Sequence, residues 1–214
     1  MSLSQATMLY LVRHGATDAN LQRPYVLQGR GMDLPLNETG QRQAQCVRRL
    51  FERTAVAAVY SSPLRRAFAT AEAIAEPHRL DVAMIDALIE CDVGRWEGMA
   101  WVQIRREFPR EYEDFQRDQS QFPYLGGESY RDVSLRALPA LAELLERHAG
   151  RSIVVVAHNV VIRACAATYL GIPLSRAKDV NQNNGGVSVL RRENGRTDLI
   201  TLNSIFHIEE ELRS

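Results

Sequence analysis

Three short apolar runs, each followed by a segment with helical signals, limit the folds open to this chain most strongly. The runs are Met8–Val12, Ala55–Tyr60 and Ile153–Ala157, and each has the length of a buried strand. Strands that alternate with helices form a largely parallel sheet. Each helix returns the chain to the end of the sheet where the previous strand began, so the next strand runs in the same direction. The pattern therefore predicts an α/β fold in which helices flank a mostly parallel central sheet.

The segments after the first two runs carry signals of helix starts. Either Asn37 or Thr39 can cap a helix whose apolar residues recur on one face. After the second run, Ser61-Ser62-Pro63 predicts a turn, with Pro63 at the first position of an alanine-rich helix over 64–75. We expect both helices to pack on the sheet.

The later part of the chain divides into an insertion, a capped helix and a hairpin. Aromatic residues among dense charges over 94–128 predict a helical insertion that covers the open end of the sheet. Ser129, with Asp132 three residues later, predicts a capped helix that Pro139 kinks. Two strand-like runs on either side of Asn194-Gly195 predict a terminal hairpin.

Size, charge and cysteine spacing exclude several classes of protein. The chain has 214 residues, of which 45% are hydrophobic, so we expect one domain over 1–214 with a single sizeable core. Twenty-six Lys and Arg residues balance 26 Asp and Glu residues, so no global field attracts nucleic acid or a membrane surface. Cys46, Cys91 and Cys165 are widely spaced, which favours buried thiols over disulfides or a zinc ribbon.

Targeting signals and metal motifs are absent from the sequence. Residues 1–7 lack the basic and apolar parts of a signal peptide, and no apolar stretch approaches the roughly 20 residues of a membrane span. We expect a cytoplasmic protein, with an apolar sheet edge that allows a homodimer. His78, His148 and His207 share no metal-ligand spacing and are expected at the surface.

Polar motifs follow the apolar runs in a fixed order. Arg13-His14-Gly15 comes directly after the first run, and Thr17 and Asn20 complete the pattern R-H-G-x-T-x-x-N. Open α/β sheets place their chemistry at the carboxyl ends of strands. The later motifs are, in order, Gln28-Gly29, Ser62-Pro63-Leu64-Arg65-Arg66-Ala67, Glu90 with Gly94 and Trp96, Gly126-Gly127-Glu128-Ser129, and Ala157-His158 with Arg163.

This series resembles the histidine phosphatase superfamily, the phosphoglycerate-mutase-like proteins, through nearly the whole chain. The Gly-Gly-Glu-Ser segment and the modest length are more similar to the small-substrate phosphatase branch than to the mutases. The resemblance implies a single-domain, phosphoglycerate-mutase-like α/β/α sandwich of three layers. It also implies a metal-independent phosphomonoesterase without a cofactor, which hydrolyses a small phosphorylated metabolite through a phosphohistidine.

The resemblance assigns the phosphate chemistry to two histidines and two arginines. His14 becomes the nucleophile, which requires one unprotonated ring nitrogen and a hydrogen bond that holds the other. Arg13 grips phosphate oxygens, and its fixed charge disfavours protonation of His14. Of Arg65 and Arg66, the family pattern selects Arg66, which directly precedes alanine. His158 stabilises the charge on the transferring phosphoryl oxygens and should be protonated when phosphate is bound.

A carboxyl group is needed to protonate the leaving alkoxide, and the resemblance assigns this part to Glu90. Such a donor must hold a proton near neutral pH, although nearby arginines favour its ionised form. A bound phosphate dianion would offset those cations and raise the pKa of Glu90. Asp92 and Glu97 are neighbouring carboxylates that could be mistaken for the donor.

The remaining matched positions are expected to bind the substrate. Asn20, Gln28 and Gly29 fall in the implied set, whereas Thr17 could equally bind phosphate or cap the helix that follows. Asn159 stands where the family usually has glycine. Its backbone N–H can still serve phosphate at a helix N-terminus, but its side chain enters space that is normally empty.

Two other functions stay open at this point. A phosphoglycerate mutase shares the chemistry but must retain a bisphosphorylated intermediate. Retaining a second phosphate or a carboxylate calls for extra cations in the insertion. Arg105, Arg106, Arg110 and Arg117 lie there, in surroundings that do not resemble the mutase pattern. A catalytically silent scaffold would keep the pocket only to bind phosphate, but every matched catalytic position holds the residue that the chemistry requires. The sequence leaves the physiological substrate open.

Overall fold

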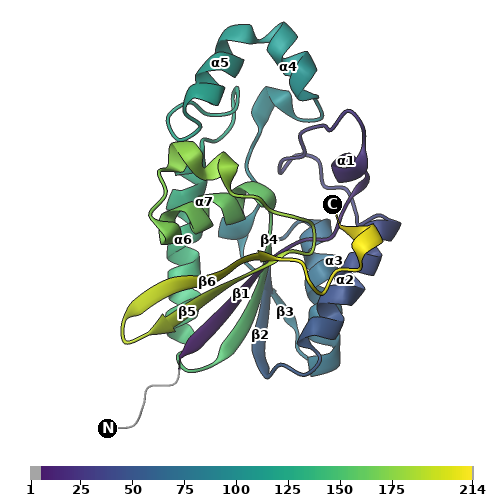
Figure 1. The fold of residues 1–214 in the computed structure, drawn as a ribbon, viewed down its shortest axis with the longest axis vertical. Coiled ribbons are helices and arrows are strands. Elements are labelled where there is room, and N and C mark those ends of the chain that lie inside the picture. The colour runs from purple at the N-terminus through teal and green to yellow at the C-terminus, as the bar shows by residue number, and fades with distance from the viewer. Residues whose placement is uncertain (1–5, 214) are drawn as a thin grey trace.

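A six-stranded sheet runs through the computed structural model, which describes residues 6–213 (Figure 1). The strand order is β3-β2-β4-β1-β5-β6. The strands on one side pair in parallel, whereas the last two pair antiparallel, so the mostly parallel α/β sheet is confirmed. The strands are β1 (Thr7–Arg13), β2 (Val56–Ser61), β3 (Val82–Met84), β4 (Ser152–Ala157), β5 (Val187–Glu193) and β6 (Arg196–Ser204).

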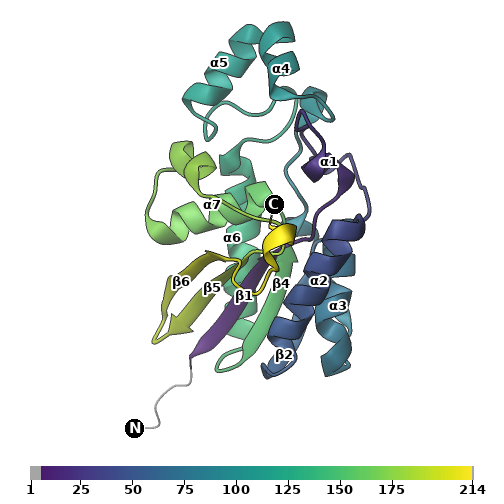
Figure 2. The same ribbon diagram turned by 45° about the vertical axis from the view of Figure 1, so that its right-hand side comes forward.

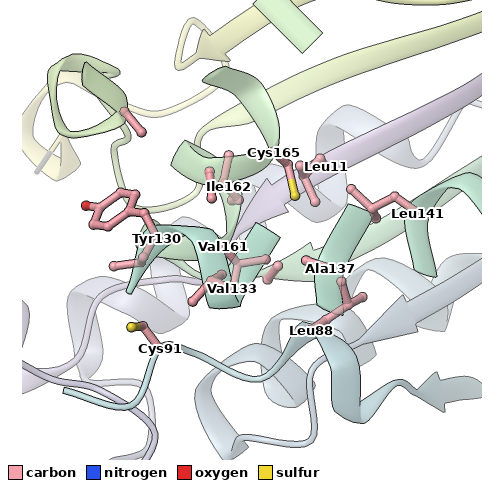
Figure 3. Packing of buried hydrophobic residues seen from close by; sticks show 14 of the residues in the cluster. Leu11, Leu88, Cys91, Tyr130, Val133, Ala137, Leu141, Val161, Ile162 and Cys165 are labelled. Carbon is pink, nitrogen blue, oxygen red and sulfur yellow. The ribbon is translucent and has the colours of Figure 1, made fainter. Parts of the chain in front are cut away.

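Helices cover both faces of this sheet, which gives the expected three layers (Figure 2). On one face, α2 (Glu38–Phe51) and α3 (Arg65–Ala75) bury apolar side chains against Val154 and Val156 of β4. On the other face, α6 (Tyr130–Arg147) and α7 (Asn159–Leu170) pack on the alternate strand residues. Figure 3 shows this second core, in which Leu11, Val133, Leu141 and Val161 are among the packed side chains.

Strand register brings the polar strand ends together. In β1 and β4, Arg13 pairs with Ala157, and in β2 and β4, Ser61 pairs with Val156. The three strands therefore end side by side. The residues that follow them, which include His14 and His158, share one edge of the sheet, as the sequence order predicts for a parallel arrangement.

The segment over 94–128 is helical and lies beyond this edge of the sheet (Figure 1). It contains the 3-10 helix η3 (Gly94–Trp96), α4 (Trp101–Glu107) and α5 (Pro109–Arg117). Trp96 is fully buried and packs edge-on against Phe115 and Tyr124, and these aromatic rings extend the core on the α6 and α7 face of the sheet.

The predicted caps and the hairpin turn are confirmed, and the start of one helix is corrected. Asn37 caps α2 by accepting from the Gly40 N–H, and Ser129 and Asp132 form the expected capping box of α6, which continues through Pro139. The terminal hairpin turns at Asn194-Gly195, where both residues have positive φ. Pro63 was predicted as the first helical residue, but α3 begins at Arg65. Leu64 stays extended at the N-cap position, where the hydroxyl of the preceding Ser62 accepts its N–H.

Smaller elements complete the described chain. They are α1 (Asp18–Leu21) and the 3-10 helices η1 (Glu76–His78), η2 (Asp86–Leu88), η4 (Leu174–Asp179) and η5 (Glu210–Leu212). No helix within 6–213 is long and apolar enough to cross a membrane. The residues that bear most on the cytoplasmic expectation, 1–5, lie outside the described part of the chain.

One histidine lies in the interior, contrary to prediction. His148 is only 8% exposed, and its Nε2 is 2.8 Å from the Tyr60 hydroxyl. The prediction failed because the hydrogen-bond partner of this ring, Tyr60, lies 88 positions away in the sequence. His78 and His207 are half-buried, and the three cysteines are buried free thiols.

Candidate active site

A cavity of about 230 Å³ opens at the edge of the sheet where β1, β2 and β4 end. Its wall includes most of the residues expected in the site: Arg13, His14, Asn20, Gln28, Glu90 and Asn159. The other four, Thr17, Gly29, Arg66 and His158, lie behind that wall, and each makes hydrogen bonds to neighbouring residues there. The structure thus brings the expected residues into one region.

The His14 ring has one nitrogen held by the backbone and the other turned toward an arginine. Nδ1 donates to the Gly15 carbonyl oxygen at 2.7 Å, so this nitrogen carries the proton. Nε2 accepts from Arg66 Nε at 3.3 Å. Burial, together with the charges of Arg66 and Arg13, holds the pKa of His14 well below its usual range. The ring is therefore neutral, and its unprotonated nitrogen is Nε2, which accepts from Arg66.

Arg66, rather than Arg65, lies beside this histidine. Arg66 is fully buried, and its guanidinium donates to the carbonyl oxygens of Met32 and Gly29 at 3.1 Å each. Arg65 is exposed, because successive helical residues point in directions about 100° apart. The loop that follows Gln28 thus supplies the acceptors that orient one cation of the site.

Arg13 supplies a second buried cation. It donates to the Gln182 carbonyl oxygen at 2.6 Å, and its Nε has no hydrogen-bond partner among the residues that the structure describes. Burial lowers the pKa of Arg13 to about 10, so the side chain is still charged at neutral pH. Sequence reasoning did not identify Gln182, whose carbonyl oxygen holds this side chain.

Glu90 is the carboxylate that reaches the cavity. It is 4% exposed and accepts from the backbone N–H groups of Cys91 at 2.8 Å and Val160 at 3.3 Å. Burial raises its pKa, whereas the two N–H groups and the charges of Arg66 and Arg13 oppose the rise. The net direction is upward, as a proton donor requires.

The other two carboxylates are engaged elsewhere and do not line the cavity. Glu97 accepts from Gly29 N at 2.5 Å and from Gly31 N at 3.1 Å, so it holds the loop that in turn holds Arg66. Asp92 forms an ion pair with Arg30 at 2.6 Å. The geometry therefore favours Glu90 over both alternatives as the donor.

Arg136, which sequence reasoning missed, holds the segment that carries Glu90. Arg136 of α6 donates to the carbonyl oxygens of Ala87 and Ile89 at 2.7 Å each, and it pairs with Glu128 at 2.8 Å. The Gly-Gly-Glu-Ser motif pointed to Glu128, but no local pattern pointed to its partner.

His158 completes the cluster from the end of β4. Its Nε2 is hydrogen-bonded with Ser62 Oγ at 2.7 Å, and its ring centre lies 5.0 Å from that of His14. Its Nδ1 is buried and has no partner within the described chain. Burial and the charges of Arg66 and Arg13 hold the pKa of His158 well below its usual range.

The polar turn after Gly15 forms the side wall. Thr17 is fully buried at the N-cap position of α1, and its hydroxyl donates to Gln28 Oε1 at 2.7 Å. Asn20 accepts from the Thr17 N–H at 3.0 Å and from Asn184 Nδ2 at 3.2 Å. Thr17 therefore orients the side chains that face the cavity, and Asn20 and Gln28 are the ones exposed to it.

Asn159 lines the cavity as the first residue of α7. Its Oδ1 is buried and meets no hydrogen-bond donor in the part of the chain that the structure describes. Asn159 thus lies in the wall of the cavity and carries a buried, unpartnered acceptor.

The far wall holds residues that sequence reasoning did not place in the site. Lys178 is one of them, although a simple signal was available, because it is the only lysine in the sequence. The others that contribute polar groups are Tyr25, Gln116, Gln119, Tyr130 and Arg163.

Comparisons with known proteins show the family and the fold. A family model described as "Histidine phosphatase superfamily (branch 1)" matches residues 9–205. Phosphoserine phosphatase 1 from Hydrogenobacter thermophilus is 34% identical over 202 residues, which cover 94% of each chain. Glucosyl-3-phosphoglycerate phosphatase from Mycobacterium tuberculosis is 32% identical over 80% of this chain and 78% of its own. Among solved structures, Bacillus stearothermophilus YhfR superposes with a TM-score of 0.87 at 30% identity, covering 95% of this chain and all of that one.

Proposed function

The chain belongs to branch 1 of the histidine phosphatase superfamily, and on that premise we propose that His14 carries the phosphoryl group during hydrolysis of a small phosphate monoester. Its class is phosphoric monoester hydrolase, the class of the phosphatases that it resembles. The observation that supports the role of His14 is its ring: Nδ1 is held by a carbonyl oxygen, and Nε2 is unprotonated beside Arg66.

The first half-reaction moves the phosphoryl group to the enzyme. Nε2 of His14 attacks phosphorus, the P–O bond to the alcohol breaks, and Glu90 gives its proton to the leaving oxygen. Arg13, Arg66 and His158 stabilise the charge on the three equatorial oxygens. The Arg13 and Arg66 guanidinium groups supply the positive charge of the site, whereas His158, whose pKa is lowered, contributes a hydrogen bond. The proposed step therefore does not require a metal ion.

The second half-reaction returns the phosphoryl group to water. Glu90, now ionised, accepts a proton from the water molecule as its oxygen bonds to phosphorus and the N–P bond breaks. Inorganic phosphate leaves, and His14 and Glu90 are restored to their starting states. The buried Glu90 suits both halves, because its raised pKa lets it hold a proton above the ordinary carboxyl range and still release it to the leaving oxygen.

A mutase is supported less well. Arg105, Arg106, Arg110 and Arg117 are all exposed, and none of them lines the cavity. Arg117 instead pairs with Asp114 and lies over the Phe122 ring. A retained bisphosphorylated intermediate would need cations from the insertion. The arginines of the insertion do not line the cavity and therefore do not supply them.

The proposal is tested with p-nitrophenyl phosphate in the presence of a chelator. We expect hydrolysis, and we expect rapid quenching to trap an acid-labile phosphoryl group on the peptide that contains His14. Phosphate transfer dependent on bisphosphoglycerate, with little hydrolysis, would support the mutase. Phosphate binding without any turnover would support the scaffold, and either result would overturn the proposal.

A further inference from the structure

One wall of the cavity carries two cations that the proposed hydrolysis does not use. Arg163 projects from α7, and Lys178 projects from the 3-10 helix η4; both are half-buried and line the cavity. The phosphate is already served by Arg13, Arg66 and His158. Lys178 is also the only lysine in a chain whose other basic side chains, histidine apart, are all arginine.

Neutral oxygen atoms, and no carboxylates, hold these two cations. Arg163 Nε donates to the Val180 carbonyl oxygen at 2.8 Å. Lys178 Nζ donates to the carbonyl oxygen and the side-chain oxygen of Gln116, at 2.9 and 3.2 Å. The nearby Asp179 pairs with Arg176 instead. Several donor groups on the two side chains are therefore left for a ligand.

The charge balance of the cavity calls for more than one anion. Arg13, Arg163 and Lys178 line it, with Arg66 directly behind, and Glu90 is the one carboxylate in its wall among the described residues. Half-buried cations that no anion hydrogen-bonds cost solvation free energy, which an anionic ligand can recover. A phosphate dianion bound at His14 leaves Arg163 and Lys178 without a hydrogen-bonded anion, because the exposed Asp179, whose charge acts on both, is ion-paired with Arg176.

The size of the cavity limits what can carry this second anion. About 230 Å³ is less than the roughly 300–1,000 Å³ of sites for drug-sized ligands, so both anions must sit on a short skeleton. A carboxylate fits best, because its two oxygens match a guanidinium and an ammonium in a small space. The unpartnered Oδ1 of Asn159 adds an acceptor, which suits a hydroxyl or amino group on the same skeleton.

We propose that Arg163 and Lys178 form a carboxylate subsite, so that the substrate is the phosphate ester of a small hydroxy or amino carboxylic acid. This inference rests on the proposed phosphatase function and specifies its substrate class. Phosphorus would sit at His14, and the carboxylate would lie against the α7 and η4 wall.

Matched pairs of substrates test the subsite by steady-state kinetics. The pairs are O-phosphoserine with O-phosphoethanolamine, and 3-phosphoglycerate with glycerol 3-phosphate, which differ by the carboxylate. We expect kcat/KM to favour the carboxylated member by about 10- to 100-fold, the range for a charge-assisted contact. Lys178→Met should reduce this preference at least about fivefold, whereas Lys178→Arg should keep most of it.

Arg176→Met is the matched control. Arg176 belongs to the same 3-10 helix as Lys178 but is exposed and paired with Asp179, so its loss should leave the preference intact. An equal loss of preference in this variant would mean that general surface charge, and not a subsite, selects the substrate, and would overturn the proposal.

Chemical labelling gives a readout that does not depend on turnover. Because Lys178 is the only lysine, an amine-acetylating reagent modifies one side chain, and the α-amino group serves as the internal standard. In the His14→Asn variant, saturating 3-phosphoglycerate should slow acetylation of Lys178 at least about threefold more than inorganic phosphate does. Mass spectrometry of the Lys178 peptide measures this protection.

The outcomes separate the subsite from the phosphatase. Hydrolysis of p-nitrophenyl phosphate with no preference in either pair and no protection would overturn the subsite and leave the phosphatase standing. Protection without hydrolysis of any ester would support the subsite and overturn the phosphatase. A stronger preference for bisphosphates than for either carboxylated ester would overturn the assignment to a carboxylate.

Discussion

The two ends of the cavity are built in different ways. At the phosphate end, His14, Arg66 and Glu90 are nearly excluded from solvent, and each is held by backbone groups. At the substrate end, Arg163 and Lys178 are half-buried and come from α7 and the chain after it. The first arrangement holds reacting groups in one geometry, which favours a fixed chemistry. The second leaves donors free, which suits a selective contact with the substrate.

If the phosphate end carries the chemistry, replacing His14 should have the largest effect. His14→Asn removes the nucleophile, and we expect kcat to fall by at least about 10³-fold on every ester, because no other side chain can take its place. Inorganic phosphate should still bind within about tenfold of wild type, as measured by calorimetry. Retained turnover in this variant would contradict the assignment of the chemistry to the phosphate end.

Glu90→Gln should distinguish leaving groups. An amide cannot protonate an alkoxide, so kcat on alkyl phosphates should fall about 10²- to 10³-fold, with a smaller loss on p-nitrophenyl phosphate, whose leaving group needs no acid. Stopped assays on both esters measure the difference. Equal losses on the two esters would assign Glu90 to phosphate binding instead.

The pH profile tests the same carboxyl group. Because burial raises the pKa of Glu90, its protonated, active form persists above the ordinary carboxyl range and is lost as pH rises through the folded-state pKa. Activity of wild type on alkyl phosphates should therefore decline on the alkaline side. The decline should be absent from Glu90→Gln, and a flat wild-type profile with rate-limiting chemistry would count against the role.

Glu97→Gln should show that the phosphate end depends on support from outside the cavity. The carboxylate accepts two backbone N–H groups of the loop that holds Arg66, so its loss should displace the guanidinium and lower kcat roughly tenfold. Asp92→Asn is the matched control, since Asp92 pairs with the partly exposed Arg30 and should change kcat less than twofold. Weaker phosphate binding in Glu97→Gln alone would confirm a positioning role.

The smallest effect is expected at the substrate end, from Asn159→Gly. The change removes a buried, unpartnered acceptor of a cavity-wall residue, while the backbone N–H at the start of α7 stays in place. KM for esters that carry a hydroxyl or amino group should rise about two- to fivefold, with kcat on p-nitrophenyl phosphate retained. A large loss of kcat would place Asn159 at the phosphate end and would contradict the separation of the cavity into a phosphate end and a substrate end.

Most of the phosphate end could be predicted from the sequence because its signals are local. His14 and His158 directly follow strand-length apolar runs, and parallel pairing brings such ends together. The family pattern also separated Arg66 from Arg65, and the phase of α3 agrees with it.

The supports of those residues could not be predicted, because each depends on a contact between distant segments. Arg136 reaches the Ile89 carbonyl oxygen across 47 positions, and His148 reaches Tyr60 across 88. An arginine on a helix and a histidine after one look like surface residues until the partner is known. Pro63 was misplaced for a more local reason, the hydroxyl of Ser62 that accepts the Leu64 N–H.

The sequence by itself determined the α/β alternation, the order of the strand-end motifs and the residue types that phosphoryl transfer needs, since these depend on local periodicity and side-chain chemistry. Tertiary structure decided how those groups ionise and which further residues join them. Burial, which exists only in the folded chain, lowers the pKa of His14 and raises that of Glu90. The fold also carries Lys178 to the same cavity from 164 positions beyond His14, a proximity that no local pattern encodes.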